Sequence, residues 1–176
     1  MLALLTIAAF ASPLLPGQST LPHATPDSCR QFVQRFYDWY VPKSDDKPGP
    51  TVEDALKERR QEFGRELYSL LKEESDGQAK TDELVRLDFD PFLFSQDPCN
   101  RYVAQQPKLV GNIYWVEVRG DCGPTDAQRQ NVFAKVAWTG LAWEFVDFAS
   151  ARGAVDAKRS LVAMLKANRK NLYSKP

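Results

Sequence analysis

The sequence predicts an α+β fold in which amino-terminal helices pack on a curved antiparallel sheet and a further helix follows at the carboxyl end. Two observations support this prediction. Apolar residues recur at helical spacing through residues 28–71, and they alternate with polar residues later, most clearly in residues 112–118 and 131–148. Helices and strands that occupy separate parts of one chain are typical of the α+β class.

The composition limits the number of domains and the kind of partner. A chain of 176 residues with 43% hydrophobic and 26% charged residues is typical of one globular domain. Its 23 basic and 23 acidic residues cancel, so no positive surplus exists to neutralise phosphates or to hold an anionic membrane. We therefore expect no nucleic-acid partner. A small ligand or a protein is predicted instead, and a homodimer through the sheet is a further option.

The first nineteen residues carry no charged side chain, and residues 2–10 are apolar apart from Thr6. This run is shorter than the roughly twenty residues that a membrane span requires. It fits the apolar core of a secretory signal, with Gly17 and Ser19 near the cleavage position. The alternative is an amino-terminal helix that is buried in the core.

These features divide the chain into a signal peptide (residues 1–19), a flexible lead (residues 20–27) and a single α+β domain (residues 28–173). The domain is expected in the periplasm or outside the cell. The mature chain is expected to contain no membrane span.

Ser28, followed three residues later by Gln31, is typical of a capping box and predicts the start of the first helix. Its apolar stripe comprises Cys29, Phe32, Val33, Phe36, Tyr37 and Tyr40. The helix is expected to stop at Pro42. Thr51 is the predicted cap of a second helical region, which runs to the "SDGQ" segment with a break near Gly64.

Alternation then predicts strands. "NIYWVEV" is one strand, and "NVFAKVAW" and "LAWEFVDF" flank Thr139–Gly140 as a hairpin with a two-residue turn. That turn would place Lys135 opposite Glu144, an opposite-charge pair across two strands. On the other face, the same register pairs Val136 with Trp143 and Ala134 with Phe145.

A final helix is predicted from about Asp156. Its apolar residues are Leu161, Val162, Leu165 and Leu172. They recur at helical spacing, which predicts that one face of this helix packs on the rest of the domain.

The cysteines predict a disulfide. Cys99 and Cys122 are symmetric about Val110–Gly111, so a hairpin that turns there would bring the two sulfur atoms together. Such a bridge closes a loop of about two dozen residues and contributes roughly 3 kcal/mol to stability. Pro107 cannot donate to a strand partner, so the chain must be an edge strand or bulged at that point. Cys29, on the apolar stripe, is expected to be a buried and inert thiol.

No metal or cofactor is predicted. The chain has no CxxC pair, and its single histidine, His23, lies in the lead. A calcium loop built on Asp88, Asp90 and Asp97 would lack the glycine and the distal glutamate of an EF-hand. Because each of Asp90 and Asp97 precedes a proline, we interpret them as structural caps, Asp90 at a helix start and Asp97 at a turn.

Asp147 is the carboxylate with a functional alternative. In the predicted register it shares an apolar face with Val132, Val136, Trp138, Trp143 and Phe145. An acid at the end of such a face either leans out into solvent or lines a cavity, where it could act as a base.

Three motifs in this order resemble an uncharacterised family of exported bacterial domains with a nuclear transport factor 2-like, or cystatin-like, fold. They are the "FVQRFYDWYV" helix, "LDFDPFLFSQD" after a leucine-rich helix, and the "NVFAKVAWTGLAWEFVDF" hairpin followed by "SLVAMLK". The resemblance spans residues 28–172. It implies helices wrapped on a curved sheet around a cone-shaped pocket, and it implies no particular activity.

Three functional hypotheses follow. The first is a non-catalytic binding domain. It would bind a small apolar ligand in a cone lined by Tyr37, Tyr40, Trp138, Trp143 and Phe145, or a partner on an exposed face of the sheet. The second is an immunity or inhibitor protein that blocks a periplasmic hydrolase. The third is an isomerase or dehydratase of the ketosteroid isomerase type, in which Asp147 removes a proton and Tyr37 stabilises the oxyanion.

Overall fold

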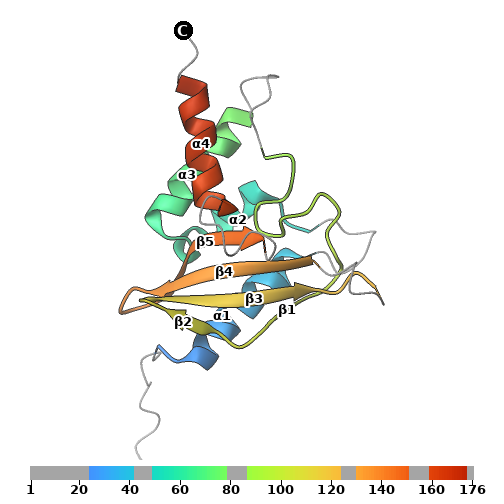
Figure 1. Ribbon diagram of the computed structural model, residues 1–176, viewed down its shortest axis with the longest axis vertical. Helices are drawn as coiled ribbons and strands as arrows, with labels where there is room; N and C mark the ends of the chain where they lie inside the picture. The colour runs from blue at the N-terminus through green and yellow to red at the C-terminus, as the bar shows by residue number, and fades with distance from the viewer. Residues whose placement is uncertain (1–23, 42–48, 79–86, 124–129, 151–158, 174–176) are drawn as a thin grey trace, which may run out of the picture.

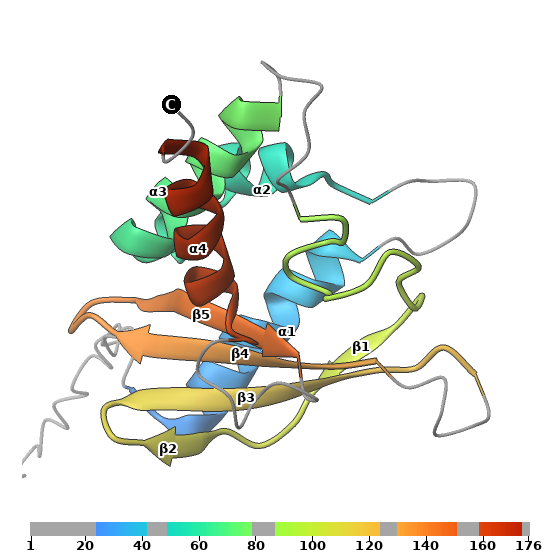
Figure 2. The same cartoon turned by 45° about the horizontal axis from the view of Figure 1, so that its top comes forward.

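The computed structural model describes residues 24–41, 49–78, 87–123, 130–150 and 159–173, and it confirms the α+β class. An antiparallel sheet has helix α1 across one face, while helices α2, α3 and α4 gather beyond the edge formed by strand β5 (Figures 1 and 2). The predicted signal peptide lies outside the described residues. None of the described helices has the length and hydropathy needed to cross a membrane.

Helix α1 (Pro26–Tyr40) begins two residues before the predicted start of the domain. Its N-cap is Thr25, whose hydroxyl accepts the N–H of Ser28, while the Ser28 hydroxyl accepts the N–H of Thr25. The predicted capping box of Ser28 with Gln31 is therefore wrong: Ser28 is the third residue of the helix, and its box partner is Thr25. All six residues of the predicted stripe are buried.

Helix α2 (Val52–Glu58), a 3₁₀ turn η1 (Arg60–Glu62) and helix α3 (Arg65–Gln78) follow. Thr51 caps α2 through a capping box with Asp54, which confirms the predicted cap. The predicted break at Gly64 is also confirmed, because its N–H donates to the carbonyl oxygen of Phe145 at 2.9 Å. A Cβ at this position would lie 3.3 Å from that oxygen, so glycine permits the close approach.

The sheet is antiparallel throughout and is centred on β3. Its strands are β1 (Tyr102–Ala104), β2 (Lys108–Val110), β3 (Ile113–Gly120), β4 (Gln130–Trp138) and β5 (Trp143–Ser150). Both β1 and β2 pair with one side of β3, β4 pairs with the other side, and β5 pairs with β4. The final helix, α4, is described over Leu161–Tyr173, and its predicted start at Asp156 lies outside the described residues.

The predicted disulfide between Cys99 and Cys122 is confirmed, with Cα atoms 4.5 Å apart. The β2–β3 turn is Gly111–Asn112 rather than Val110–Gly111, and Gly111 has a positive φ of 66°. The pairing register changes by one residue between β1 and β2, in the segment that contains Pro107. The predicted irregularity at the proline therefore exists, and it interrupts this edge of the sheet.

The predicted register of the β4–β5 hairpin is wrong. The turn contains four residues, 139–142, because the Thr139 hydroxyl accepts the N–H of Ala142 while the Thr139 N–H donates to the Ala142 carbonyl. Trp138 therefore pairs with Trp143. The hydrogen bonds of Thr139 stabilise a four-residue turn, which forms in place of the two-residue turn predicted at Thr139–Gly140.

A β-bulge changes the register a second time. Val136 pairs with Phe145 and Lys135 pairs with Asp147, so Val146 has no partner on β4. The predicted pair of Lys135 and Glu144 does not form. Because side chains alternate along a strand, the extra residue turns Asp147 to the face opposite Phe145.

Aromatic side chains fill the space between α1 and the sheet. Phe36, which is fully buried, lies at the centre of this aromatic core. Its ring contacts those of Tyr37, Tyr40, Phe63, Phe92 and Phe145, with centroids 4.9 to 5.8 Å apart. Four segments from distant parts of the chain thus meet on one ring.

The outer edge of β1 is closed by a side chain. Gln34 on α1 accepts the N–H of Ala104 at 2.8 Å and donates to the carbonyl of Tyr102 at 3.1 Å. Its amide therefore takes the place of a neighbouring strand. The outer edge of β5 is met by Gly64 at Phe145 and by Ser160, which forms a bridge with Ala149.

We predict that Gln34→Ala lowers the free energy of unfolding by about 2 kcal/mol, because it leaves a buried donor and a buried acceptor without partners. Urea denaturation would measure the change. Gln31→Ala, at an exposed position of the same helix, is the matched control and should have little effect. Equal effects of the two substitutions would contradict this role of Gln34.

Candidate functional site

The residues predicted to line a cone-shaped pocket are largely core residues. Tyr37, Tyr40 and Phe145 are at most 3% exposed. The Tyr37 hydroxyl donates to the carbonyl oxygen of Phe92 at 2.9 Å, and burial raises the pKa of Tyr37 well above its ordinary value. These side chains therefore pack in the aromatic core between α1 and the sheet.

Trp138 and Trp143 lie at one end of the sheet. The two rings are in contact, with centroids 5.0 Å apart, and Tyr114 packs on Trp143 from β3 at 5.4 Å. The indole N–H of Trp143 donates to the Ser28 hydroxyl at 3.1 Å, which joins this end of the sheet to the start of α1. The two tryptophans thus pack on each other at the end of the sheet that carries the β2–β3 and β4–β5 turns.

The predicted position of Asp147 on the apolar face is wrong because of the bulge at Val146. The Asp147 carboxylate accepts from the Lys135 ammonium at 2.9 Å and from the N–H of Val162, in the first turn of α4, at 3.0 Å. Both charged side chains are 13% exposed. Asp147 is therefore a structural anchor for α4, and the fold does not bring it together with Tyr37.

Asp90 is confirmed as a structural cap. One carboxylate oxygen accepts the N–H groups of Phe92 and Leu93 at 2.8 and 3.0 Å, and the other accepts the Tyr40 hydroxyl. Burial raises the pKa of Asp90, although these hydrogen bonds act in the opposite direction. The residues that follow form one turn rather than the predicted helix, since Phe94 ends it with a positive φ of 51°.

The predicted turn at Asp97 is also present. The Ser95 hydroxyl accepts the Asp97 N–H at 3.0 Å and donates to the Asp97 carbonyl at 2.8 Å. Within the described ranges, no group of three or more histidine, cysteine, aspartate or glutamate side chains is arranged to hold a metal ion.

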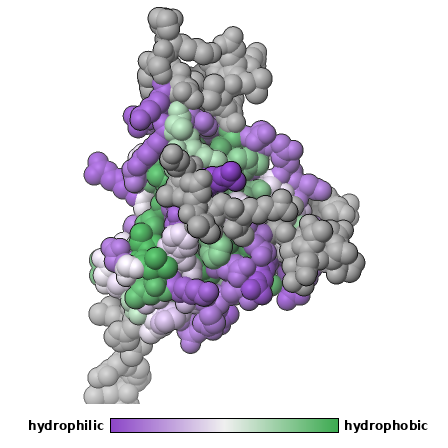
Figure 3. Space-filling view, in the orientation of Figure 1, coloured by the Kyte–Doolittle hydropathy of each residue, from purple (hydrophilic) through white to green (hydrophobic). Residues whose placement is uncertain are grey.

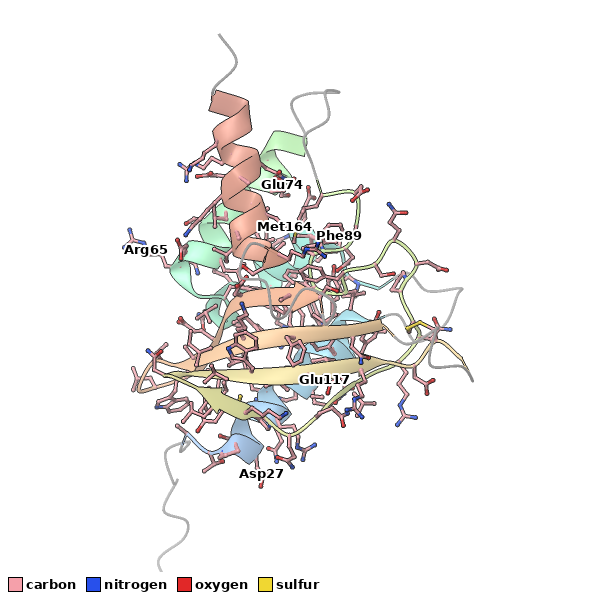
Figure 4. The ribbon with its side chains drawn as sticks, viewed as in Figure 1. Asp27, Arg65, Glu74, Phe89, Glu117 and Met164 are labelled. Carbon is pink, nitrogen blue, oxygen red and sulfur yellow. A yellow bond between two sulfur atoms is a disulfide. The ribbon has the colours of Figure 1, made fainter. Side chains whose placement is uncertain are left out.

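A cavity of about 380 Å³ lies between α2, α3 and residues 87–91. Its lining residues are Thr51, Val52, Glu53, Leu71, Glu74, Ser75, Leu87, Phe89, Asp90 and Pro91. Figure 4 labels Glu74 on α3 and Phe89 in the facing loop. The carboxylates are already engaged, because Glu53 accepts from the Ser75 hydroxyl and Glu74 from the N–H of Leu87. Each of these two acids thus accepts a hydrogen bond from within the chain.

Exposed aliphatic side chains gather at the end of the sheet above the two tryptophans. Leu109, Val110 and Leu141 are 58%, 52% and 81% exposed. The β2–β3 and β4–β5 turns lie at the same end, since Tyr114 near the start of β3 pairs with Val136 near the end of β4. Figure 3 shows apolar surface at this end, on the left of the molecule. We call these three residues the hairpin-end surface.

Sequence reasoning did not single out the hairpin-end surface. The available signal was local: "LVGN" and "TGLA" place aliphatic residues in or beside turns, where polar residues predominate. Alternation alone would assign such residues to the core. Their exposure becomes visible only once the register and the covering helices are known.

No protein-family model matches this sequence, and no curated protein matches it. Two solved chains are similar in structure, both from the type VI effector–immunity complex Tae3–Tai3 of Ralstonia pickettii. The native complex has a chain that is 17% identical, with a TM-score of 0.49, covering 73% of this chain and 97% of that one. For the selenomethionine complex the values are 16%, 0.47, 69% and 95%. Similarity at this level carries no functional argument.

We predict that the free energy of unfolding of the wild type falls, relative to that of Asp90→Asn, as pH rises above about 4. Because its folded pKa lies above the ordinary value of 3.8, the folded state holds the proton more tightly than the unfolded state. This contribution is present at low pH and is lost as pH rises through the folded pKa.

Urea denaturation between pH 3.5 and pH 7 would measure this effect, with Asp88→Asn as an exposed carboxylate control. An asparagine at position 90 can still accept the two backbone N–H groups, so the cap survives. A stability difference between the wild type and Asp90→Asn that does not vary with pH would contradict the prediction.

Proposed function

We propose that this protein is an exported, non-catalytic inhibitor or immunity protein that binds a hydrolase of the cell envelope through the hairpin-end surface. One observation carries the proposal. Three large aliphatic side chains are exposed in or beside the two turns at one end of the sheet, whereas the protein's own aromatic side chains fill the interior between α1 and the sheet.

The hairpin-end surface has the character of a protein-binding site. Large apolar side chains that are exposed at neighbouring turns favour protein association, and less conformational entropy is lost on binding when the site is rigid. Rigidity here comes from the contacts of Trp138, Trp143 and Tyr114 beneath the turns and from the Thr139 hydrogen bonds that close one of them. These contacts hold the two turns in place, so their exposed side chains are presented to a partner in a fixed arrangement.

Export is supported by the disulfide and by the amino-terminal sequence. A bridge between Cys99 and Cys122 is of the kind that persists in oxidising compartments. The uncharged apolar run before residue 20 is of the kind that directs secretion. Together they favour a partner in the periplasm or outside the cell.

Catalysis by the nominated pair has no support from the geometry. The Asp147 carboxylate is held by Lys135 and α4 on one face of the sheet, and the Tyr37 hydroxyl is bonded to a backbone carbonyl on the other. A second candidate function, binding of a small ligand, is favoured by the 380 Å³ cavity beside Asp90. It is secondary because the polar groups that border this cavity already have partners in the chain.

The inhibitor proposal predicts that the purified mature chain suppresses a wall-degrading activity of its host. Periplasmic and secreted fractions would be incubated with dye-labelled peptidoglycan, with and without the chain at about micromolar concentration. Leu141→Asp should weaken inhibition at least tenfold, or about 1.4 kcal/mol, because it places a charge in an apolar contact.

The matched control for this test is Ser69→Asp, which adds the same carboxylate at an exposed position on α3. It should inhibit as the wild type does. The proposal fails if no fraction loses hydrolase activity when the chain is present at about 10 μM, a concentration at which a specific inhibitor saturates its target. It fails in its choice of surface if Leu141→Asp inhibits as well as the wild type.

A further inference from the structure

Strand β2 is an open stretch of sheet edge. The outer edge of β1 is closed by Gln34, and that of β5 is met by Gly64 and Ser160. In the described part of the chain, no hydrogen bond covers the outer side of β2, and all three of its residues are exposed. Proteins normally protect such edges, so an open one that carries apolar side chains calls for a partner.

The backbone of Leu109 points outward from this edge. Val110 and Ile113 flank the two-residue turn and form the hydrogen-bonded pair that closes it. The next pair, Leu109 and Tyr114, is then a non-hydrogen-bonded pair of the antiparallel ladder. The N–H and carbonyl groups of Leu109 are therefore directed away from β3, where an added strand would meet them.

The side chains of β2 indicate which residues an added strand should carry. Leu109 and Val110 are more than half exposed, and Lys108 is exposed with no carboxylate in reach among the described residues. Lys135, one strand further into the sheet, is already neutralised by Asp147. Within the described ranges, the charge on β2 that has no ion-pair partner is thus that of Lys108, and it is positive.

We propose that β2 is the recognition strand of this protein: an extended segment of its protein partner adds to the sheet as an antiparallel strand beside Leu109 and places a carboxylate opposite Lys108. This inference rests on the proposed function for the statement that the partner is a protein. Main-chain hydrogen bonds would supply affinity, and the charge and the apolar contacts would supply specificity.

A second copy of this chain fits the edge less well. If two β2 strands paired antiparallel about Leu109, each Lys108 would lie opposite Val110 of the other copy. The ammonium groups would then gain no compensating charge. A strand of different sequence, with an acidic residue in that position, satisfies both the backbone and the charge.

Two synthetic peptides test the inference without knowledge of the partner. Both are capped hexapeptides, TVEVTV and TVKVTV, with alternate amides N-methylated so that one edge only can pair and the peptides do not stack. They would be titrated into ¹⁵N-labelled mature chain. The TVEVTV peptide should shift the amide signals of Lys108, Leu109 and Val110 and slow hydrogen exchange at Leu109, with at least fivefold weaker binding of TVKVTV.

Two substitutions separate the backbone from the side chain. Leu109→Ala removes the aliphatic group and keeps the outward N–H, so it should weaken TVEVTV binding only modestly. Leu109→Pro also removes the N–H, without removing a bond to β3, and should abolish binding. Lys108→Glu should reverse the preference so that TVKVTV binds better, and this readout holds even if the proline variant disturbs the hairpin.

Several outcomes overturn the inference. They are an unshifted Leu109 amide at about 1 mM TVEVTV, an unchanged peptide preference in Lys108→Glu, and β2 signals that move with chain concentration alone, which would make a second copy the occupant. Hydrolase inhibition that survives both Lys108→Glu and Leu109→Pro would leave the proposed function standing and remove this inference. Peptide binding without inhibition of any hydrolase would do the reverse.

Discussion

The packing around Phe36 is the constraint on which the rest of the structure depends. This one ring joins α1 to the segment at Phe63, to the turn at Phe92 and to β5 at Phe145. Aromatic rings in edge-to-face contact bury large apolar areas in well-defined geometry. Because four segments share the contact, none of them can move away from the sheet without opening the others. The interior is closed for that reason.

Because side chains fill the interior between α1 and the sheet, a partner has to bind at the surface, and the covering elements limit where. The helices cover one face of the sheet and the β5 edge, and Gln34 covers β1, so the opposite face and the end that carries the two turns and β2 are left without a described helix (Figure 2). The bulge at Val146 completes this division. It turns Asp147 away from the interior and toward Lys135 and α4, where the carboxylate stabilises the helix start instead of serving a cavity.

Much of this fold could be predicted from the sequence because the relevant signals are local. Helical spacing identified the buried stripe of α1, Thr51 and Asp90 were identified as caps, and the spacing of Cys99 and Cys122 indicated their bridge. The hairpin register was missed because two weak local effects decided it. The Thr139 hydroxyl closes a four-residue turn, and one unpaired residue changes the pairing further along.

The site was harder to predict because exposure is a property of the whole fold. Leu109 and Leu141 have the composition of core residues, and only the absence of a covering helix or strand in the described structure sets them apart from Val116 or Leu165. The same holds for the β2 edge, since Gln34 closes β1 from a position 70 residues away in sequence. The similarity to nuclear transport factor 2-like domains stays a prediction that the comparisons do not test.

Hydrogen exchange of the chain, free and bound to the hydrolase that it inhibits, tests the central claim most directly. The claim is that the partner is bound by the end of the sheet and not by an internal pocket. We predict that binding slows exchange in residues 108–114 and 139–143 and leaves residues 49–53 and 87–91 unchanged. Protection confined to the segments around the Asp90 cavity, with the two turns unaffected, would contradict the account.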